Sequence, residues 1–426
     1  MSKVRVRIAP SPTGFAHIGT LWMALFNYAY AKRNHGKFIL RLDDTDIDRE
    51  VKGAEQAIYE NLTWAGITWD EGPDKGGKFG PYKQSEKLDV YKSKAEELIR
   101  KKLAFLDEGA IRVKAQPKQI EWIDLKRGIV VFPAKELEKD FVIIKSNGYP
   151  TYHFATVVDE IDMKISHVIR GDEHISNTPR QILFYELLGY KPPEFAHIPT
   201  IRNKSGKKLS KRSDPIDLSA YRKQGYLPEA LVNYLCQIGW SHPKGKDVFD
   251  LDEFVELFSL DRVQKSEPKL DTDKLDWINA TYIRNISVQK FDIMISNSNS
   301  DYKKLSNDKR LQIASLVQTR IKKLSDFNIL AGFFFRSPRV DIKLLGQDYK
   351  NHLNDAHNTL TGLSRWKIDN INNALADLIE KQHFTVGKFY MDVRIAITGS
   401  KMTPPINESL EILGKDETLK RLKKLT

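Results

Sequence analysis

Two segments of this chain carry residues suited to chemistry on a chain of phosphates. They read Ala9-Pro10-Ser11-Pro12-Thr13-Gly14-Phe15-Ala16-His17-Ile18-Gly19-Thr20 and Lys208-Leu209-Ser210-Lys211-Arg212. His17 is suited to donate a hydrogen bond to a phosphate oxygen as negative charge builds on it, and Gly19 would let an adenine ring or a phosphate approach the backbone. Lys208 and Lys211 would bring two ammonium groups to the same phosphates. Together these groups predict adenylyl transfer from ATP.

Each segment also has a simpler interpretation. A lone histidine in a proline-rich turn before a helix is often an ordinary helix cap. The second segment belongs to a run, 204–212, with five basic residues in nine positions. Such a run is typical of a solvated or nucleic-acid-facing loop. The residues alone leave both alternatives open.

The surrounding pattern predicts the elements that would position these groups. Strand patterns at 4–9 and 37–42 alternate with helical patterns at 18–34, 53–65 and 87–102. We therefore expect a doubly wound parallel sheet of Rossmann-like type, with ligands above the carboxyl ends of the strands. The sheet is expected to resume with strands 141–145, 157–158, 167–170 and 195–201 and with a helix at 178–189. After Pro228 the pattern becomes helical, and 296–300 is interpreted as a linker or loop.

Composition narrows the classes of protein. The chain has 426 residues, a net charge of +12 and one cysteine, Cys236. Its length predicts two or three domains, and its charge favours a polyanionic partner. Residues 301–350 hold 11 Lys and Arg and 5 Asp, a surplus of 6. One cysteine excludes internal disulfides and a cysteine-based zinc site. We expect a cytoplasmic monomer without zinc and without a membrane span.

The order of the motifs resembles that of class I aminoacyl-tRNA synthetases, and the surrounding residues resemble glutamyl-tRNA synthetases of the bacterial type. The matching segments are Arg7-Ile8-Ala9-Pro10-Ser11-Pro12-Thr13-Gly14, Arg41-Leu42-Asp43-Asp44-Thr45-Asp46, Gly80-Pro81-Tyr82-Lys83-Gln84-Ser85-Glu86, Pro150-Thr151-Tyr152-His153-Phe154-Ala155, His167-Val168-Ile169-Arg170-Gly171-Asp172-Glu173-His174, Gly225-Tyr226-Leu227-Pro228-Glu229-Ala230-Leu231 and Leu275-Asp276-Trp277-Ile278-Asn279. The likeness is weakest between about 285 and 385 and returns near Thr398-Gly399 and Pro404-Pro405-Ile406.

The resemblance implies a set of site residues. His17, Lys208 and Lys211 would be catalytic. The ATP-binding set would be His17, Gly19, Glu173, His174, Thr200, Ile201, Lys208, Ser210 and Lys211. The glutamate-binding set would be Arg7, Ala9, Ser11, Asp43, Tyr152, Thr156 and Arg170. Arg170 would take the side-chain carboxylate through its planar fork, and Asp43 would take the α-ammonium. ATP would be a substrate accompanied by Mg²⁺, with no metal ligand from protein side chains.

Two of these arginines have structural alternatives. Arg7 alternates with Arg5 and is open to interpretation as an exposed strand residue, and Arg170 as part of an ion pair with Asp172 or Glu173. The chain also departs from the family pattern. Asp43-Asp44-Thr45-Asp46 stands where bacterial members usually have Glu-Asp-Thr-Asp, which shortens the reach to the ammonium.

A deletion is the larger departure. Between Phe105 and Ile111, relatives usually have a few dozen more residues. Acceptor binding would then rely on Trp122, Lys126 and Arg127, although the last two are equally compatible with solvated charges in a turn. Phe333-Phe334-Phe335 is interpreted as core. Arg320, Lys322 and Lys323 would face tRNA.

The expected organisation has five parts. Residues 1–102 and 141–215 form the two halves of the catalytic domain, with a small α/β acceptor-binding insertion at 103–140. A helical stem-contact domain at 216–295 and a helical anticodon-binding domain at 296–426 would follow.

The predicted function is ATP-dependent joining of L-glutamate to tRNA(Glu) through glutamyl-adenylate, and tRNA(Gln) is a second candidate substrate. Three alternatives remain: a glutaminyl-tRNA synthetase, a tRNA-modifying glutamyl transferase, and a catalytically inactive tRNA-binding relative.

Overall fold

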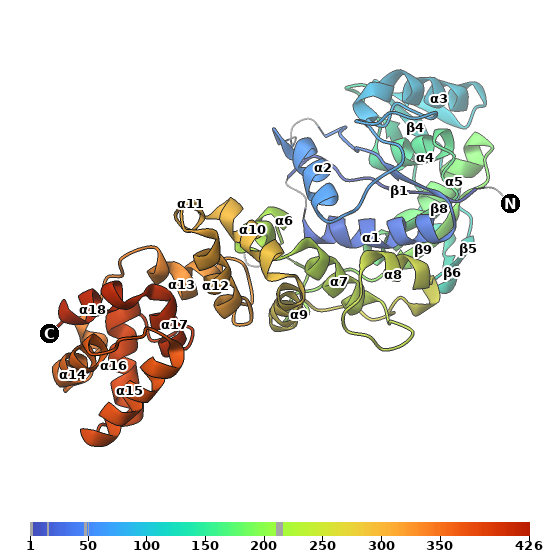
Figure 1. Cartoon of the computed structure of the whole chain (residues 1–426). Coiled ribbons are helices and arrows are strands. Elements are labelled where there is room, and N and C mark those ends of the chain that lie inside the picture. The colour runs from blue at the N-terminus through green and yellow to red at the C-terminus, as the bar shows by residue number, and fades with distance from the viewer. Residues whose placement is uncertain (1–2, 15–16, 47–48, 50, 210–215) are drawn as a thin grey trace. The chain divides into compact units, whose positions relative to one another are not determined.

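A computed structural model describes residues 3–14, 17–46, 49, 51–209 and 216–426. The chain divides into two units. The larger comprises residues 1–222 and 228–275, and the smaller comprises 223–227 and 276–426. Figure 1 shows strands and helices mixed in the first and helices throughout the second.

The larger unit contains both parallel and antiparallel strand pairs. The strands are β1 (Arg5–Ile8), β2 (Lys37–Leu40), β3 (Ala104–Asp107), β4 (Ala110–Val113), β5 (Ile120–Asp124), β6 (Gly128–Phe132), β7 (Phe141–Ile144), β8 (His167–Gly171) and β9 (Glu194–Ile198). β1 pairs parallel with β2, and β8 pairs parallel with β9. β1 lies beside β8, because the backbone N–H of Ser166 donates to the carbonyl of Arg5 at 3.0 Å. The parallel α/β architecture predicted from the alternating pattern is confirmed.

The larger unit also contains helices. They are α1 (Ile18–Arg33), α2 (Ala54–Trp64), α3 (Leu88–Arg100), α4 (Tyr152–Asp162), α5 (Thr178–Leu188), α6 (Leu218–Gln224), α7 (Pro228–Gly239) and α8 (Leu251–Leu257). Phe38 of β2 packs against Tyr28 of α1. Its neighbour Ile39 belongs to a buried cluster with Ile182 and Leu183 of α5. Because successive strand residues point to opposite faces, α1 and α5 cover opposite sides.

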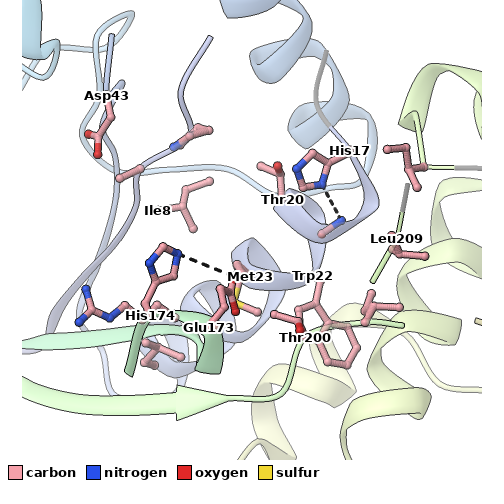
Figure 2. A pocket seen from close by; sticks show the side chains of 18 of the residues that line it. Ile8, His17, Thr20, Trp22, Met23, Asp43, Glu173, His174, Thr200 and Leu209 are labelled. Carbon is pink, nitrogen blue, oxygen red and sulfur yellow. Dashed lines mark hydrogen bonds and ion pairs between the residues drawn. The ribbon is translucent and has the colours of Figure 1, made fainter. Parts of the chain in front are cut away.

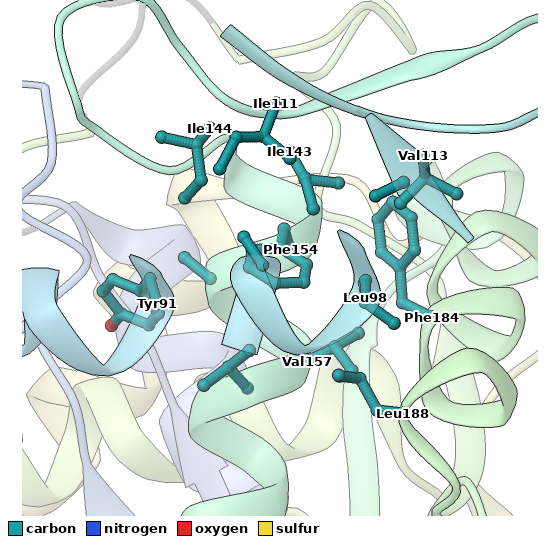
Figure 3. Packing of buried hydrophobic residues seen from close by; sticks show 14 of the residues in the cluster. Tyr91, Leu98, Ile111, Val113, Ile143, Ile144, Phe154, Val157, Phe184 and Leu188 are labelled. Carbon is teal, nitrogen blue, oxygen red and sulfur yellow. The ribbon is translucent and has the colours of Figure 1, made fainter. Parts of the chain in front are cut away.

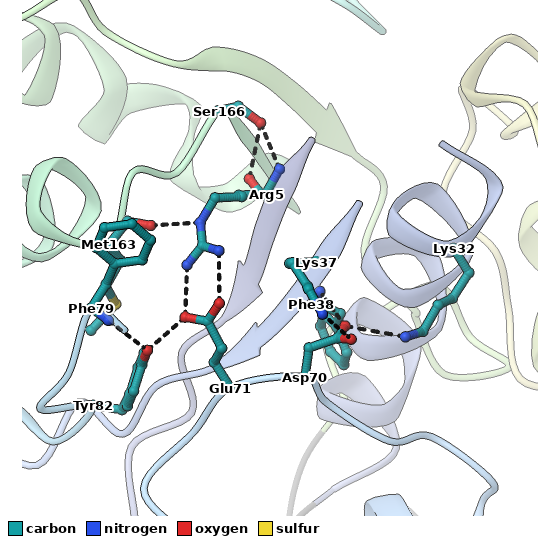
Figure 4. A network of polar contacts seen from close by, with 10 residues as sticks. All are labelled: Arg5, Lys32, Lys37, Phe38, Asp70, Glu71, Phe79, Tyr82, Met163 and Ser166. Carbon is teal, nitrogen blue, oxygen red and sulfur yellow. Dashed lines mark hydrogen bonds and ion pairs between the residues drawn. The ribbon is translucent and has the colours of Figure 1, made fainter. Parts of the chain in front are cut away.

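Polar contacts lock the edge of the first strand pair (Figure 4). Arg5 donates from Nη1 and Nη2 to the two carboxylate oxygens of Glu71, at 2.7 and 2.8 Å. Asp70 accepts from Lys32 of α1 and Lys37 of β2, each at 3.1 Å. These side-chain contacts therefore add to the backbone hydrogen bonds that hold β1 and β2 together, and they also hold α1 against this strand pair.

The region expected as a separate insertion is divided between two sheets. β3, β4 and β7 form an antiparallel sheet, whereas β6 and β5 extend the sheet that contains β9 and β8. The 141–145 strand therefore pairs with β4, not with the parallel sheet as expected. Glu108 and Gly109 join β3 to β4 with φ of +46° and +83°. Two left-handed residues are what a tight two-residue hairpin requires.

The predicted strand at 157–158 is wrong, because these residues lie in the middle of α4. Phe154, Val157 and Ile161 of α4 are buried against α3 and α5 in the cluster that Figure 3 shows. Their spacing is helical, and a two-valine run within it cannot distinguish a strand from a buried helix turn.

The smaller unit is helical. α9 (Thr272–Asn285) leads into it, and it contains α10 (Val288–Ser298), α11 (Ser300–Lys303), α12 (Asn307–Gln318), α13 (Asp326–Ala331), α14 (Tyr349–Thr361), α15 (Ile368–Lys381), α16 (Val386–Thr398), α17 (Ile406–Leu413) and α18 (Lys415–Lys423). Ser296–Ser300 is not a linker, since Asn299 caps α11 and is buried. Phe333 and Phe334 are core residues, as interpreted. Among the described helices, none has the length and apolar character to cross a membrane.

Candidate active site

A cavity of about 530 Å³ lies in the larger unit, where β1 and β8 end and α1 begins (Figure 2). Most of the expected site residues line it: Arg7, Ala9, His17, Gly19, Asp43, Tyr152, Arg170, Glu173, His174, Thr200, Ile201 and Lys208. Ser11 is exposed and Thr156 is buried, and neither is part of this lining. Ser210 and Lys211 lie outside the described residues. Segments distant in sequence thus converge on one hollow.

His17 serves as the N-cap of α1. Its Nδ1 accepts a hydrogen bond from the backbone N–H of Gly19 at 3.1 Å (Figure 2). The cap interpretation and the catalytic one are compatible, because an Nδ1 that accepts a hydrogen bond leaves Nε2 as the protonated nitrogen of the neutral ring. A Cβ on Gly19 would lie 2.9 Å from Cε1 and Nδ1 of His17. Gly19 is therefore needed for the imidazole to fold back over the helix start.

The lysine loop begins with a side-chain-stabilised turn. Oδ1 of Asn203 accepts from the backbone N–H groups of Ser205 at 3.1 Å and Lys207 at 2.9 Å. Gly206 takes a φ of +81°, and the backbones of Arg202 and Lys208 form an isolated antiparallel β-bridge. This turn brings the exposed Lys208 to the cavity wall.

Arg170 is a buried cation at the end of β8, with 5% of its surface exposed. Its Nε donates to Nε2 of His197 at 3.1 Å, and its Nη2 donates to Oγ1 of Thr178 at 2.7 Å. Nη1 is buried and has no hydrogen-bond partner among the residues that the structure describes. The alternative of an ion pair with Asp172 is wrong, because Asp172 pairs with Arg127.

Arg7 is not an exposed strand residue. It is buried and pairs with Glu160 of α4, with Nη2 2.7 Å from Oε1. Glu160 also accepts from the hydroxyl of Tyr185 at 2.7 Å. Burial alone would raise the pKa of Glu160, but the charges of Arg7 and Arg41 hold it below its usual value. Glu160 is thus an anion that fixes Arg7 against the cavity.

Asp43 is engaged by a neighbour that the sequence analysis did not single out. Arg41 donates from Nε and Nη2 to the two oxygens of Asp43 at 2.6 and 3.0 Å. Both residues line the cavity, and Nη1 of Arg41 is buried with no hydrogen-bond partner in the described part of the chain. Burial raises the pKa of Asp43, and the charge of Arg41 opposes that shift. Arg41 and Asp43 are two residues apart in an extended segment, so their side chains lie on the same face. That spacing was the sequence signal that could have identified the pair.

The remaining residues of the cavity wall differ in charge and in pKa. Tyr152 is 42% exposed, and its ring centroid lies 6.3 Å from that of His174. Desolvation and the positive charges of Arg170 and Arg7 lower the pKa of His174 to about 4. Burial and the nearby Asp172 raise the pKa of Glu173. One side of the cavity is thus cationic, with a neutral histidine beside it.

Two of the expected acceptor-binding residues, Trp122 and Lys126, are buried, whereas Arg127 is exposed and pairs with Asp172. Trp122 is buried in the core cluster with Phe195. The Nζ of Lys126 is held 3.1 Å from the carbonyls of both Leu260 and Asp261. Neither of the alternatives considered for Lys126 therefore describes its contacts, and a basic side chain in a turn gives no sequence signal for burial.

The expected tRNA-facing residues of the smaller unit are partly engaged. Arg320 and Lys322 are exposed. Lys323 lies 3.7 Å from a carboxylate oxygen of Asp276 and over the ring of Tyr226. Among the described residues, no group of three or more histidine, cysteine or acidic side chains is arranged to hold a metal ion.

The arrangement suits an anionic ligand. The guanidinium groups of Arg41 and Arg170 are buried, and each keeps one nitrogen without a hydrogen-bond partner among the described residues. Asp43 holds Arg41, whereas His197 and Thr178 hold Arg170. Backbone N–H groups and His17 at the start of α1 add a second electropositive end. Such a cavity can hold an acidic small molecule beside a phosphate chain.

Comparison with known proteins agrees with this geometry. Residues 3–110 and 107–277 match the family model described as "tRNA synthetases class I (E and Q), catalytic domain". Residues 282–426 match an anticodon binding domain. The first match breaks at 107–110, where Glu108 and Gly109 close the tight hairpin.

Curated relatives extend over nearly the whole chain. The glutamate–tRNA ligase of Acidothermus cellulolyticus is 38% identical, over 99% of this chain and 95% of that protein. Glutamate–tRNA ligase 1 of Fervidobacterium nodosum is 36% identical, over 99% of both. A crystal structure of a glutamate tRNA ligase from Elizabethkingia meningosepticum, in complex with its amino acid, superposes with a TM-score of 0.87 at 31% identity, covering 99% of each chain.

Proposed function

Since this chain belongs to the glutamate–tRNA ligases, which are class I aminoacyl-tRNA synthetases, we propose that it joins L-glutamate to the 3′ end of tRNA(Glu). Glutamate and ATP would react first, giving glutamyl-adenylate and pyrophosphate. The tRNA would then take the glutamyl group and release AMP. The observation that carries this proposal is the buried guanidinium of Arg170, with Nη1 unpartnered, in the same cavity as His17 and Lys208.

Selection of glutamate follows from the charge of that wall. A carboxylate can accept from Nη1 of Arg170, whereas the amide nitrogen of glutamine would bring donors toward a donor. A site built to hydrogen-bond one group discriminates strongly against an analogue that leaves buried polar atoms unpaired. Arg41 and Arg7 add positive charge, and Tyr152 offers a neutral hydroxyl. Asp43 would take the α-ammonium while it stays paired with Arg41.

In the first step, the α-carboxylate of glutamate attacks the α-phosphorus of ATP. Nε2–H of His17 would donate to a phosphate oxygen, and the ammonium groups of Lys208 and Lys211 would offset charge on the phosphates. In the second step, a hydroxyl of the terminal adenosine attacks the activated carbonyl, and AMP departs. No protein nucleophile is required, because positioning and electrostatics supply the rate enhancement.

The adenosine would lie near Gly19, Glu173, His174, Thr200, Ile201 and Ser210. Mg²⁺, which shields phosphate charge, would enter with ATP and be held by the phosphates. The remaining glutamate contacts would come from Ala9, Ser11 and Thr156. The helical unit would recognise the tRNA, with contacts from Arg320, Lys322 and Lys323 to its phosphates. We further propose that the enzyme works as a monomer in the cytoplasm.

Aminoacylation assays test this proposal directly. Transcripts of tRNA(Glu) and tRNA(Gln) are each incubated with labelled glutamate and, separately, with labelled glutamine. Glutamate on tRNA(Glu) is the expected product, and glutamate on tRNA(Gln) as well would broaden the substrate range. Glutamine on tRNA(Gln) would instead make the protein a glutaminyl ligase. Absence of ATP–pyrophosphate exchange in the presence of tRNA would indicate an inactive tRNA-binding relative.

A further inference from the structure

A chain of buried polar groups stands behind Arg170. Nδ1 of His197 lies 2.5 Å from Oδ2 of Asp124, and Nε2 of His197 lies 3.1 Å from Nε of Arg170. Oγ1 of Thr178 lies 3.0 Å from the same Nε2 and accepts from Nη2 of Arg170 at 2.7 Å. Asp124, His197 and Thr178 are all at most 1% exposed. None of them is in the cavity lining.

The direction of the protons follows from the chemistry of arginine. A guanidinium can only donate, so Nε2 of His197 must accept. The ring proton then resides on Nδ1 and is donated to Asp124. Desolvation and the charge of Arg170 lower the pKa of His197 despite the opposing effect of Asp124, which agrees with a neutral ring. A histidine protonated at Nε2 would place one donor against another.

Asp124 is itself held rigidly. Its Oδ1 accepts from the backbone N–H groups of Lys126 and Arg127, each at 2.9 Å. The backbone N–H of His197 lies 3.2 Å from both oxygens of the same carboxylate. Asp124 also pairs with Phe195 where β5 meets β9. Backbone donors thus orient the carboxylate, the carboxylate orients the imidazole, and the imidazole orients the guanidinium.

We propose that Asp124 and His197 are positioning residues for glutamate recognition, which hold Arg170 through Nε so that Nη1 remains for the side-chain carboxylate of glutamate. This inference rests on the proposed function, since it assigns the reason why Arg170 is placed to bind that carboxylate. Hydrogen bonds from residues behind a ligand-binding group set its orientation and tautomer. A purely structural role would instead lower stability and impair all substrates alike.

Asp124→Asn gives the most selective test. The amide can keep its oxygen on the N–H groups of Lys126 and Arg127, while its NH₂ replaces the Oδ2 acceptor. Nδ1 of His197 must then accept, and its proton moves to Nε2, against Nε–H of Arg170. An exchanged tautomer of this kind disrupts function with little change of shape. In ATP–pyrophosphate exchange with tRNA(Glu), we expect KM for glutamate to rise roughly tenfold or more and KM for ATP to stay within about twofold.

A second pair of variants separates the hydrogen bond from packing. His197→Gln keeps an acceptor near the position of Nε2, whereas His197→Leu removes it. We expect the leucine variant to show the selective rise in KM for glutamate and the glutamine variant to recover most of the affinity. His167→Gln is the matched control, because His167 lies at the start of the same strand as Arg170 and is not in the cavity lining. Thermal unfolding of each variant measures any loss of fold.

Nitrogen-15 NMR of labelled histidine supplies a readout independent of activity. The His197 signal, assigned by its loss in His197→Gln, should show a protonated Nδ1 in the native protein and a protonated Nε2 in Asp124→Asn. Equal rises in the KM of glutamate and ATP, an unchanged KM for glutamate, or a native Nε2–H tautomer would overturn the inference. If the native protein failed to activate glutamate, the proposed function would fail, and the native NMR signal would still test the proton arrangement.

Discussion

Asp43 binds Arg41 with both carboxylate oxygens, 2.6 Å from Nε and 3.0 Å from Nη2, inside the wall of the cavity. Arg41 is 1% exposed, and the carboxylate of Asp159 lies 3.6 Å from its Nε. Asp43, the shorter side chain at this position, is therefore already ion-paired with Arg41 in the absence of a substrate ammonium group. This pair makes Asp43 a structural residue as well as a proposed ligand contact.

Asp43→Asn should accordingly cost stability as well as affinity. The substitution removes the bidentate partner of the buried Arg41 and leaves Asp159, at 3.6 Å, as its remaining ion-pair partner, and breaking a buried pair costs about 3 kcal/mol or more. We expect a lower urea midpoint for the larger unit and a higher KM for glutamate. Asp46→Asn is the control, because Asp46 forms an exposed pair with Arg49, and exposed pairs contribute little to stability. Equal midpoints for the two variants would contradict the prediction.

Gly19→Ala should separate helix stability from ATP use. Alanine favours a helix by about 1 kcal/mol over glycine, so folding should not suffer. The new Cβ would however sit 2.9 Å from the ring of His17 and displace it. We expect kcat/KM for ATP to fall by about tenfold or more, measured by exchange at saturating tRNA. Gly387→Ala, whose Cβ would meet nothing within 4 Å, should leave ATP kinetics unchanged.

Lys211→Ala tests the second lysine of the loop. If its ammonium stabilises the transition state, the activation rate should fall by roughly 100-fold or more, while the Kd for tRNA changes little. Single-turnover adenylate formation and filter binding measure the two quantities. Lys207→Ala is the neighbouring control, since Lys207 is exposed and outside the cavity lining. Parallel losses of rate and tRNA affinity would make Lys211 an RNA contact.

The partly buried His153 should make stability depend on pH. Desolvation and the positive charges of Arg180 and Arg170 lower its pKa to about 4, against 6.5 for an ordinary histidine. Below pH 6.5 the unfolded chain therefore binds a proton that the folded chain does not, and stability falls until the pH approaches about 4. His174 acts in the same direction.

His153→Gln should reduce this pH dependence. The difference in the free energy of unfolding between about pH 7 and pH 5 should become smaller by on the order of 1 kcal/mol. Urea unfolding at the two pH values measures it. His383→Gln, at an exposed position of the helical unit, serves as the control. A native protein as stable at the lower pH as at the higher one would refute the assignment.

The amino-acid sequence predicts the local elements well where one periodicity dominates. The helix expected at 18–34 is Ile18–Arg33, and the one expected at 178–189 is Thr178–Leu188. The sequence pattern wrongly predicts a strand at 157–158, and it assigns 141–145 to the wrong sheet. Short apolar runs fit either a strand or a buried helix turn, and pairing between distant strands leaves no local signature.

The candidate site shows the same division. Arg7, His17, Asp43 and Arg170 were identified by their motifs, and all line the cavity. Their partners Glu160, Asp124 and His197 were not, because each is brought near by folding across many residues. Lys126 was misinterpreted for the same reason, since its acceptors are carbonyls more than a hundred positions away.

The hairpin closed by Glu108 and Gly109 has one more consequence. The alignments with two curated relatives run over 481 and 475 residues, against 426 in this chain, and the family match breaks at this hairpin. Asp124, which we propose orients Arg170, lies outside the hairpin, on β5 in the sheet that contains β9 and β8. The two-residue turn between β3 and β4 is therefore a suitable insertion site. A tag or an acceptor-binding domain from another protein would begin and end there at neighbouring strand ends, and we expect the reaction to be unaffected.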